Sequence, residues 1–212
     1  MASAALVPNG PFPIQLKQAI LALEHLLASG VQPQNIQIIG DSAGAGLILQ
    51  LLSHILHPID AVPPLVLPSR IGGFYLMSPW VSLTGDTGSH AVNDKSDVIS
   101  AKTLGYWGRS VLVDVPESQN AYVEAVKAPE EWFKGADGVV KRVLITAGAA
   151  ECLRDDIVQF ADVFKKHHPD VEVVVQKGGV HDDPYYDFSV KESKLGELTP
   201  LIVKWFAEGF DS

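Results

Sequence analysis

The sequence predicts an α/β domain built on a mainly parallel sheet flanked by helices. Short apolar segments of strand length alternate with longer segments of helical periodicity along the chain. The segment Val143-Leu144-Ile145 is apolar without interruption, which is typical of a strand buried on both faces. The chain of 212 residues contains no internal repeat or low-complexity tract. We therefore expect a single domain over residues 1–212.

The first part of the chain predicts two helices and two strands. Apolar residues within 14–28 recur at helical spacing. Residues 35–39 are rich in isoleucine and predict a short strand, and 43–56 predict a helix that is apolar nearly all round and therefore buried. Residues 71–77 predict the next strand.

The segment 78–140 has a looser pattern. It is rich in Gly, Ser and Asp at first, and then places Leu104, Trp107 and Val111 on one face of a short helix. A connection of this length between two strands is too long for a plain loop, so we interpret 78–140 as a lid or pocket wall inserted into the domain.

The last part of the chain returns to the regular alternation. Residues 143–147 and 171–175 predict strands, and 153–166 predict the helix between them. Thr199 is placed to cap a final helix, with Pro200 at its first position.

Composition and charge exclude several classes of function. The chain has 25 acidic residues against 16 Lys and Arg, a formal charge of −9, which argues against a nucleic-acid partner. Its single cysteine, Cys152, cannot form an intramolecular disulfide and is interpreted as a small buried residue. No segment reaches the roughly 18 apolar residues of a membrane span, and the start lacks the pattern of a signal peptide. We therefore expect a cytoplasmic protein.

A candidate nucleophile lies in Gly40-Asp41-Ser42-Ala43-Gly44, between a predicted strand and a predicted helix. A serine on such a sharp turn is held clear of the sheet, and its small neighbours let the chain pass tightly. The amide of Ala43 then points toward negative charge that forms near Ser42. The alternative is a glycine-rich turn before a helix that binds an anion or nothing.

A serine hydroxyl needs a base, and His181 is the best candidate among the seven histidines. It follows the strand 171–175 through a flexible loop, and the carboxyl ends of strands are where α/β sheets gather their sites. The other histidines lie on helices, at helix ends or in the irregular segment. The alternative is a loop histidine without a catalytic role.

The third member of such a triad is a carboxylate that orients the histidine. Glu151 lies in the turn just after the strand 143–147 and is our choice, with Asp155 as the rival and a solvated surface acid as the alternative. The chain order Ser42, Glu151, His181 is the serine–acid–histidine order of α/β-hydrolases.

These motifs resemble the hormone-sensitive-lipase-type branch of the α/β-hydrolase superfamily, the fold-3 esterases. The similar segments run from Leu6 nearly to the final helix, and the clearest are these: Leu6-Val7-Pro8-Asn9-Gly10-Pro11-Phe12-Pro13, Gly40-Asp41-Ser42-Ala43-Gly44, Ser78-Pro79-Trp80, Glu151-Cys152-Leu153-Arg154-Asp155-Asp156 and His181-Asp182. The resemblance implies an esterase without a cofactor, and it departs from the family where Glu151 stands in place of the usual catalytic Asp.

The family also carries a His-Gly-Gly-Gly-type motif upstream of the segment that Leu6 begins, and this sequence contains none. The resemblance therefore implies that the N-terminal strands and half of the oxyanion hole are missing here. We expect a partial sheet with an open edge, through which the chain self-associates.

The expected function is that of a serine hydrolase of small or medium apolar carboxylic esters. Trp80, Trp107, Tyr185 and Tyr186 line its pocket or, alternatively, belong to the core. No H-E-x-x-H pair supports a metal site. Two other functions stay open: a non-catalytic or weakly active remnant that acts as a binding module, and an enzyme of small-molecule biosynthesis with a hydrolase fold.

Overall fold

All strands of the sheet are parallel in the computed structural model, which describes residues 5–85, 87–190 and 194–210. The strands are β1 (Gln37–Asp41), β2 (Gly73–Met77), β3 (Val143–Gly148) and β4 (Val171–Gln176), and they lie side by side in chain order. The sheet therefore gathers all four carboxyl ends, and the loops that follow them, at one edge.

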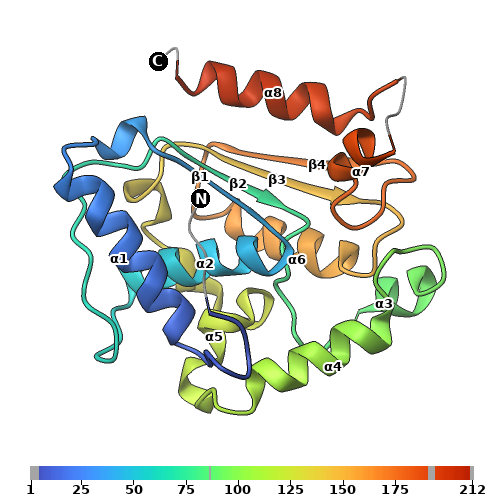
Figure 1. Cartoon of the computed structure of the whole chain (residues 1–212), viewed down its shortest axis with the longest axis horizontal. Coiled ribbons are helices and arrows are strands. Elements are labelled where there is room, and N and C mark those ends of the chain that lie inside the picture. Colours follow the sequence, from blue (N-terminus) through green and yellow to red (C-terminus); the bar gives the residue numbers. More distant parts are fainter. Residues whose placement is uncertain (1–4, 86, 191–193, 211–212) are drawn as a thin grey trace.

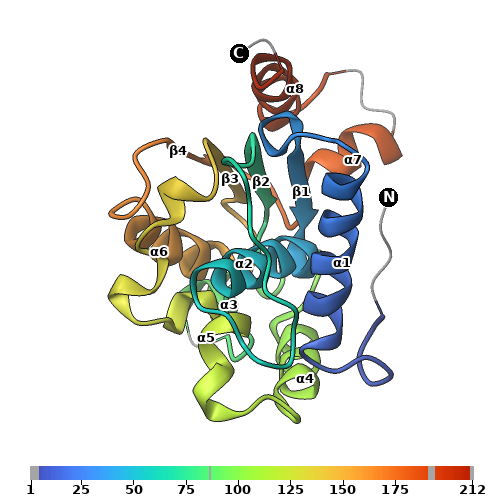
Figure 2. The ribbon, with the colours of Figure 1, turned by 90° about the vertical axis from the view of Figure 1, so that its left-hand side faces the viewer.

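Helices cover both faces of this sheet. Helices α1 (Ile14–Ala28), α2 (Ser42–Leu56) and α6 (Arg154–Phe164) lie on one face, and α8 (Leu198–Glu208) crosses the other (Figure 1). Seen from the side, β1 and α1 lie at one end of the sheet and β4 at the other (Figure 2). This layered arrangement of a parallel sheet between helices confirms the predicted fold class.

Burial follows the position of each strand in the sheet. Every residue of the central strands β2 and β3 is buried, whereas β1 and β4 at the two ends are partly exposed. Tyr75 and Leu144 pack against Trp205 of α8, while the opposite face joins the main core under α2 and α6. On β1, which has a strand partner on one side only among the described residues, Ile39 is 55% exposed.

The segment 78–140 is mostly helical and packs beside the sheet. Its helices are α3 (Gly88–Asn93), α4 (Ala101–Leu112) and α5 (Asn120–Val123), and α5 contacts α2. Figure 1 places α3 near the carboxyl ends of the strands, on the same side as the short helix α7 (Pro184–Ser189). Short 3-10 turns complete the chain at Pro33–Asn35, Glu117–Gln119, Ala125–Lys127, Glu130–Phe133 and Ala136–Gly138.

The predicted strands and helices are present with boundaries shifted by at most two residues, except that one detail is wrong. The final helix begins at Leu198, and Thr199 does not cap it, because its hydroxyl donates to Asp187 Oδ2 at 2.5 Å instead. On α4, Leu104 and Gly108 are buried and Trp107 is 45% exposed. A Cβ on Gly108 would lie 1.8 Å from the Leu83 carbonyl oxygen, so this face has no room for a side chain.

Candidate active site

The serine predicted as nucleophile lies at the junction of β1 and α2. Ser42 has φ +49°, a left-handed conformation that is rare for a residue with a side chain. A Cβ on Gly40 would lie 2.4 Å from the Gly44 carbonyl carbon, so only glycine lets the strand pass the helix this closely. Ala43 follows in the first turn of α2, where backbone N–H groups have no partner within the helix. The turn thus combines a strained serine with free amide donors.

The predicted acid lies in the turn after β3. The side chain of Glu151 is fully buried, and its Oε2 accepts a hydrogen bond of 2.7 Å from Ser78 Oγ. Burial raises the pKa of Glu151 above its ordinary value, against the nearby His181 and the hydrogen bond from Ser78, which both lower it. A carboxylate this deeply buried is stable only beside groups that compensate its charge.

His181 provides that compensation from the loop after β4. Its Nδ1 lies 3.5 Å from Glu151 Oε2, an ion-pair distance somewhat longer than a hydrogen bond. Its Nε2 lies 3.3 Å from Asp182 Oδ2. Burial lowers the pKa of His181, but the contacts with Glu151 and Asp182 outweigh it, and the pKa lies above its ordinary value.

The structure therefore brings two of the three predicted residues into contact. Glu151 and His181 meet at the carboxyl end of the sheet, at the edge where Ser42 follows β1. Among the described residues, neither ring nitrogen of His181 makes a hydrogen bond, to Ser42 or to any other group.

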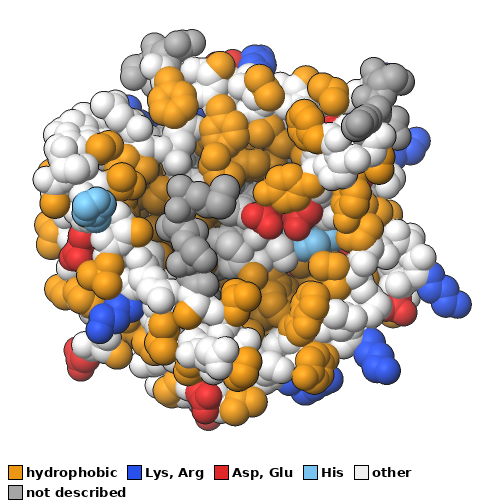
Figure 3. Space-filling view, viewed as in Figure 1, with side chains coloured by type: hydrophobic (Ala, Val, Ile, Leu, Met, Phe, Trp, Pro, Cys, Tyr) orange, Lys and Arg blue, Asp and Glu red, His pale blue; other side chains and the backbone are white. Residues whose placement is uncertain are grey.

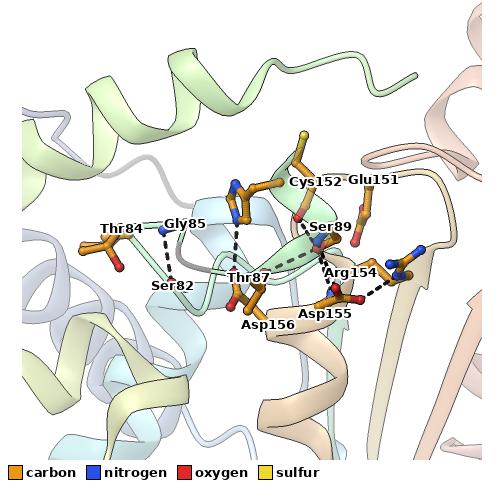
Figure 4. Close-up of polar contacts among 12 residues, drawn as sticks. Ser82, Thr84, Gly85, Thr87, Ser89, Glu151, Cys152, Arg154, Asp155 and Asp156 are labelled. Carbon is orange, nitrogen blue, oxygen red and sulfur yellow. Dashed lines mark hydrogen bonds and ion pairs between the residues drawn. The ribbon is translucent and has the colours of Figure 1, made fainter. Parts of the chain in front are cut away.

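Asp155, the rival acid, faces a different environment. It accepts a hydrogen bond of 2.9 Å from the Ser89 N–H and pairs with Arg154 at 2.8 Å, as Figure 4 shows. The Arg154 hydrogen bond lowers the pKa of Asp155 despite partial burial. Beside it, His90 and Asp156 form a buried pair of 3.1 Å that joins α3 to α6. The contacts of Asp155 thus fasten α3 to the start of α6.

Sequence reasoning missed three polar residues at this edge. Ser78 directly follows β2 and has φ +43°; its hydroxyl donates to Glu151 and accepts a hydrogen bond of 3.1 Å from the Asp182 N–H. Asp182 has φ +55°, and burial raises the pKa of its carboxyl to about 7. Asp97, after α3, accepts hydrogen bonds from the N–H groups of both Cys152 and His181. Ser78 follows a strand end, as the predicted site residues do, and could have been found that way.

The face that carries β1 is largely apolar. Figure 3 shows acidic side chains and a histidine set among hydrophobic side chains on the face seen in Figure 1. Of the aromatic residues considered for a pocket, Trp80 is buried, whereas Tyr185 and Tyr186 on α7 are 49% and 39% exposed. The two tyrosines are thus accessible, and Trp80 belongs to the core.

Neither a metal cluster nor a membrane helix is found in the part of the chain that the structure describes. No group of three or more His, Cys, Asp or Glu side chains there is arranged to hold a metal ion. No helix there combines the length and apolar character needed to cross a membrane. Cys152 is fully buried, as expected. Its burial, and to a smaller extent the negative charge of the nearby Asp97, raise the pKa of its thiol to about 12.

A parallel sheet with a serine at a strand–helix turn and an acid–histidine pair at neighbouring strand ends defines the α/β-hydrolase class. The sequence profile of a family described as alpha/beta hydrolase fold matches residues 5–183. The chain belongs to this α/β-hydrolase family, as its motifs predict.

Known relatives and solved structures agree with this assignment. The chain is 30% identical over 169 residues to a protein named esterase from Acinetobacter venetianus, covering 79% of this chain and 50% of that protein. An acetyl-hydrolase from Streptomyces hygroscopicus is 33% identical over 92 residues, 43% of this chain and 28% of that protein. The crystal structure of an esterase/lipase from an uncultured bacterium superposes with a TM-score of 0.79 at 21% identity, over 99% of this chain and 65% of that one. The chain spans about half the length of the curated relatives it matches.

Proposed function

We propose that this protein is a serine hydrolase of carboxylic esters with the triad Ser42, Glu151 and His181. The contact between Glu151 Oε2 and His181 Nδ1 carries the proposal, because it lies at the sheet edge where the Ser42 turn also ends. A buried carboxylate that faces one ring nitrogen fixes the histidine so that the other nitrogen can accept a proton. Ser42, at its strained turn, is the proposed nucleophile, and His181 would accept the proton of its hydroxyl.

The mechanism follows from these positions. Ser42 Oγ attacks the ester carbonyl carbon as its proton passes to His181 Nε2, and the Ala43 N–H stabilises the negative oxygen of the tetrahedral intermediate. His181 then returns the proton to the leaving alcohol, and water releases the acid by the same steps. Nε2 faces Asp182, so the proposed mechanism requires this nitrogen to exchange the Asp182 carboxylate for the Ser42 hydroxyl.

The substrate class we propose is a small or medium apolar ester. The exposed aromatic side chains of α7, Tyr185 and Tyr186, would receive an apolar acyl or alcohol group. Two relatives bear the names esterase and acetyl-hydrolase, which favours short acyl groups.

One observation favours a non-catalytic or weakly active protein as the second candidate. Neither ring nitrogen of His181 makes a hydrogen bond among the described residues, so the structure shows no hydrogen bond through which His181 would take the Ser42 proton. A serine hydroxyl without a base is a weak nucleophile. An enzyme of small-molecule biosynthesis would use the same triad on an ester or lactone intermediate. It would differ from the proposed esterase only in its substrate.

Hydrolysis of p-nitrophenyl acetate and butyrate by the purified protein and its Ser42→Ala variant tests the proposal. We expect Ser42→Ala to lower kcat/KM at least about 10³-fold, because the nucleophile is lost. Ser110→Ala is the matched control, since Ser110 is a serine on α4 that hydrogen-bonds to Tyr106 within its own helix. Turnover that persists in Ser42→Ala would refute the serine mechanism, and a folded wild-type protein without turnover would favour the non-catalytic candidate.

Three further predictions from the sequence belong to this proposal. Segment 78–140 would act as a lid or pocket wall, as its long excursion between β2 and β3 indicates. Self-association through the open edge of β1 would cover the exposed Ile39. The cytoplasmic location stays a prediction from the sequence.

A further inference from the structure

The end of α3 and the turn after it, residues 93–97, lie against the turn that carries Glu151. Asn93 Nδ2 donates to the carbonyl oxygens of Glu151 at 2.8 Å and Ala149 at 3.3 Å. These bonds fix the backbone of the acid turn from outside the sheet, because 93–97 belongs to the excursion between β2 and β3.

Asp97 extends this contact to the histidine loop. Its Oδ2 accepts a hydrogen bond of 2.6 Å from the Cys152 N–H, one residue after Glu151. Its Oδ1 accepts a hydrogen bond of 3.0 Å from the backbone N–H of His181. The same Oδ1 also accepts the N–H of the adjacent Val98 at 2.8 Å, which holds the carboxylate in place. One carboxylate therefore joins the backbones that carry the proposed acid and the proposed base.

We propose that Asp97 is a positioning residue that sets the distance and orientation between Glu151 and His181 by bridging their two loops. The inference rests on the proposed function, because it assigns Asp97 to the same acid–histidine pair. Asp97 acts through the backbone N–H groups of Cys152 and His181 and touches neither the substrate nor Ser42. Glu151 Oε2 and His181 Nδ1 lie 3.5 Å apart, so a small shift of either loop decides whether these two atoms form a hydrogen bond.

The chemistry of Asp97 suits this task better than that of an amide. An ionised carboxylate accepts hydrogen bonds at both oxygens, whereas the amide of an asparagine accepts at one position and donates at the other. The NH2 group of an asparagine at position 97 would face the N–H of either Cys152 or His181, and the hydrogen bond to that loop would be lost. The negative charge also matters, since the carboxylates that face His181 are those of Glu151, Asp182 and Asp97. Each of them favours the protonated imidazole.

The test compares Asp97→Asn with Asp94→Asn in the whole chain. Asp94 lies three residues earlier, and its Oδ1 accepts the Ala101 N–H. Its charge acts on Cys152 but is not among the charges that raise the pKa of His181, so it is a control of equal charge. Two quantities are measured: the pH dependence of kcat and kcat/KM on p-nitrophenyl butyrate, and the titration of the His181 imidazole by NMR. The His181 signal is assigned by its absence in His181→Gln.

We expect Asp97→Asn to lower kcat by about tenfold or more with little change in KM, because the pair is misplaced while the binding surface is intact. We also expect the His181 titration, and with it the acid limb of kcat/KM, to move to lower pH by about half a unit or more, because a facing negative charge is gone. Asp94→Asn should match the wild type in both. Asp97→Glu, which keeps the charge but changes the reach, should lower kcat while leaving the titration near its wild-type position.

An unchanged His181 titration in Asp97→Asn overturns the proposal, even if stability or activity falls, because Asp97 would then be a structural residue only. Should Asp97→Asn fail to fold, an unchanged kcat in Asp97→Glu overturns it equally. Failure of the proposed function looks different: the wild type shows no turnover, or Ser42→Ala is as active as the wild type. The NMR titration still decides the role of Asp97 in that case.

Discussion

Replacing Asp182 with asparagine should stabilise the fold at neutral and alkaline pH. The Asp182 side chain is 16% exposed, and its Oδ1 is buried without a hydrogen-bond partner among the described residues. Burial is the largest cause that raises its pKa to about 7 from an ordinary 3.8. A group with such a raised pKa is ionised at a cost to the folded state.

The sign and size of the effect follow from linkage. The folded protein keeps a proton on Asp182 that the unfolded chain releases above about pH 4, so the stability of the wild type falls as pH rises from 4 to 7. Each pKa unit corresponds to about 1.36 kcal/mol, so the shift from 3.8 to about 7 amounts to at most about 4 kcal/mol. Asparagine carries no charge and removes this cost, but it also removes the ion pair with His181, so 4 kcal/mol is the upper limit of the gain.

The assay is urea unfolding of wild type and Asp182→Asn at several pH values between 4 and 8. We expect the difference in free energy of unfolding to grow in favour of the variant across that range, by up to about 4 kcal/mol, and to level off above pH 7. Asp60→Asn is the control, because Asp60 is an exposed loop residue. Its free energy of unfolding should differ from that of the wild type by no more than about 0.5 kcal/mol, and this difference should not change with pH. A flat difference for Asp182→Asn, or a variant less stable than the wild type at pH 8, would falsify the reasoning.

Two other predictions concern the site itself. Glu151→Gln should lower kcat on p-nitrophenyl butyrate by about 10³–10⁴, because the histidine loses its buried carboxylate, whereas Asp155→Asn should change kcat little and lower the free energy of unfolding by about 1 kcal/mol. The reverse order of kcat values would make Asp155 the acid. Gly40→Ala should destabilise the fold by about 3 kcal/mol in urea unfolding, because its Cβ would lie 2.4 Å from the Gly44 carbonyl carbon. Gly44→Ala is the matched control, since its Cβ would meet no atom closer than 3.9 Å, and equal losses in the two variants would contradict the packing argument.

The strands and the order of the candidate site residues could be predicted because they depend on local patterns. An apolar run such as Val143-Leu144-Ile145 indicates a buried strand wherever it lies, and the structure buries all of it. Parallel strands bring their carboxyl ends to one edge, so residues that follow different strands meet without any knowledge of the contacts. That rule was enough to predict that Glu151 and His181 would lie together.

The support around the pair could not be predicted, because it depends on contacts between distant parts of the chain. Ser78 and Glu151 are 73 positions apart, and Asp97 and His181 are 84 apart. No sequence period links such residues. Asp97 lies in an irregular turn whose sequence is like that of many solvent-exposed turns, so nothing in it indicates a contact with His181. The wrong prediction that Thr199 caps the last helix has the same origin. Its hydroxyl hydrogen-bonds to Asp187 on the preceding helix instead of to the backbone of its own helix.

The proposed nucleophile and the acid–histidine pair are held by different forces, and substitutions should separate them. Ser42 depends on backbone packing between Gly40 and Gly44, which is inseparable from the junction of β1 and α2, so changes there act on folding first. Glu151 accepts a hydrogen bond from Ser78, and the His181 N–H donates one to Asp97; both supporting side chains lie outside the two loops of the pair. Changes there act on the distance and charge within the pair while the sheet persists. A change at Ser78 or Asp97 therefore alters the geometry of the pair directly, at a cost of about 1–3 kcal/mol for each buried hydrogen-bonding group left without a partner.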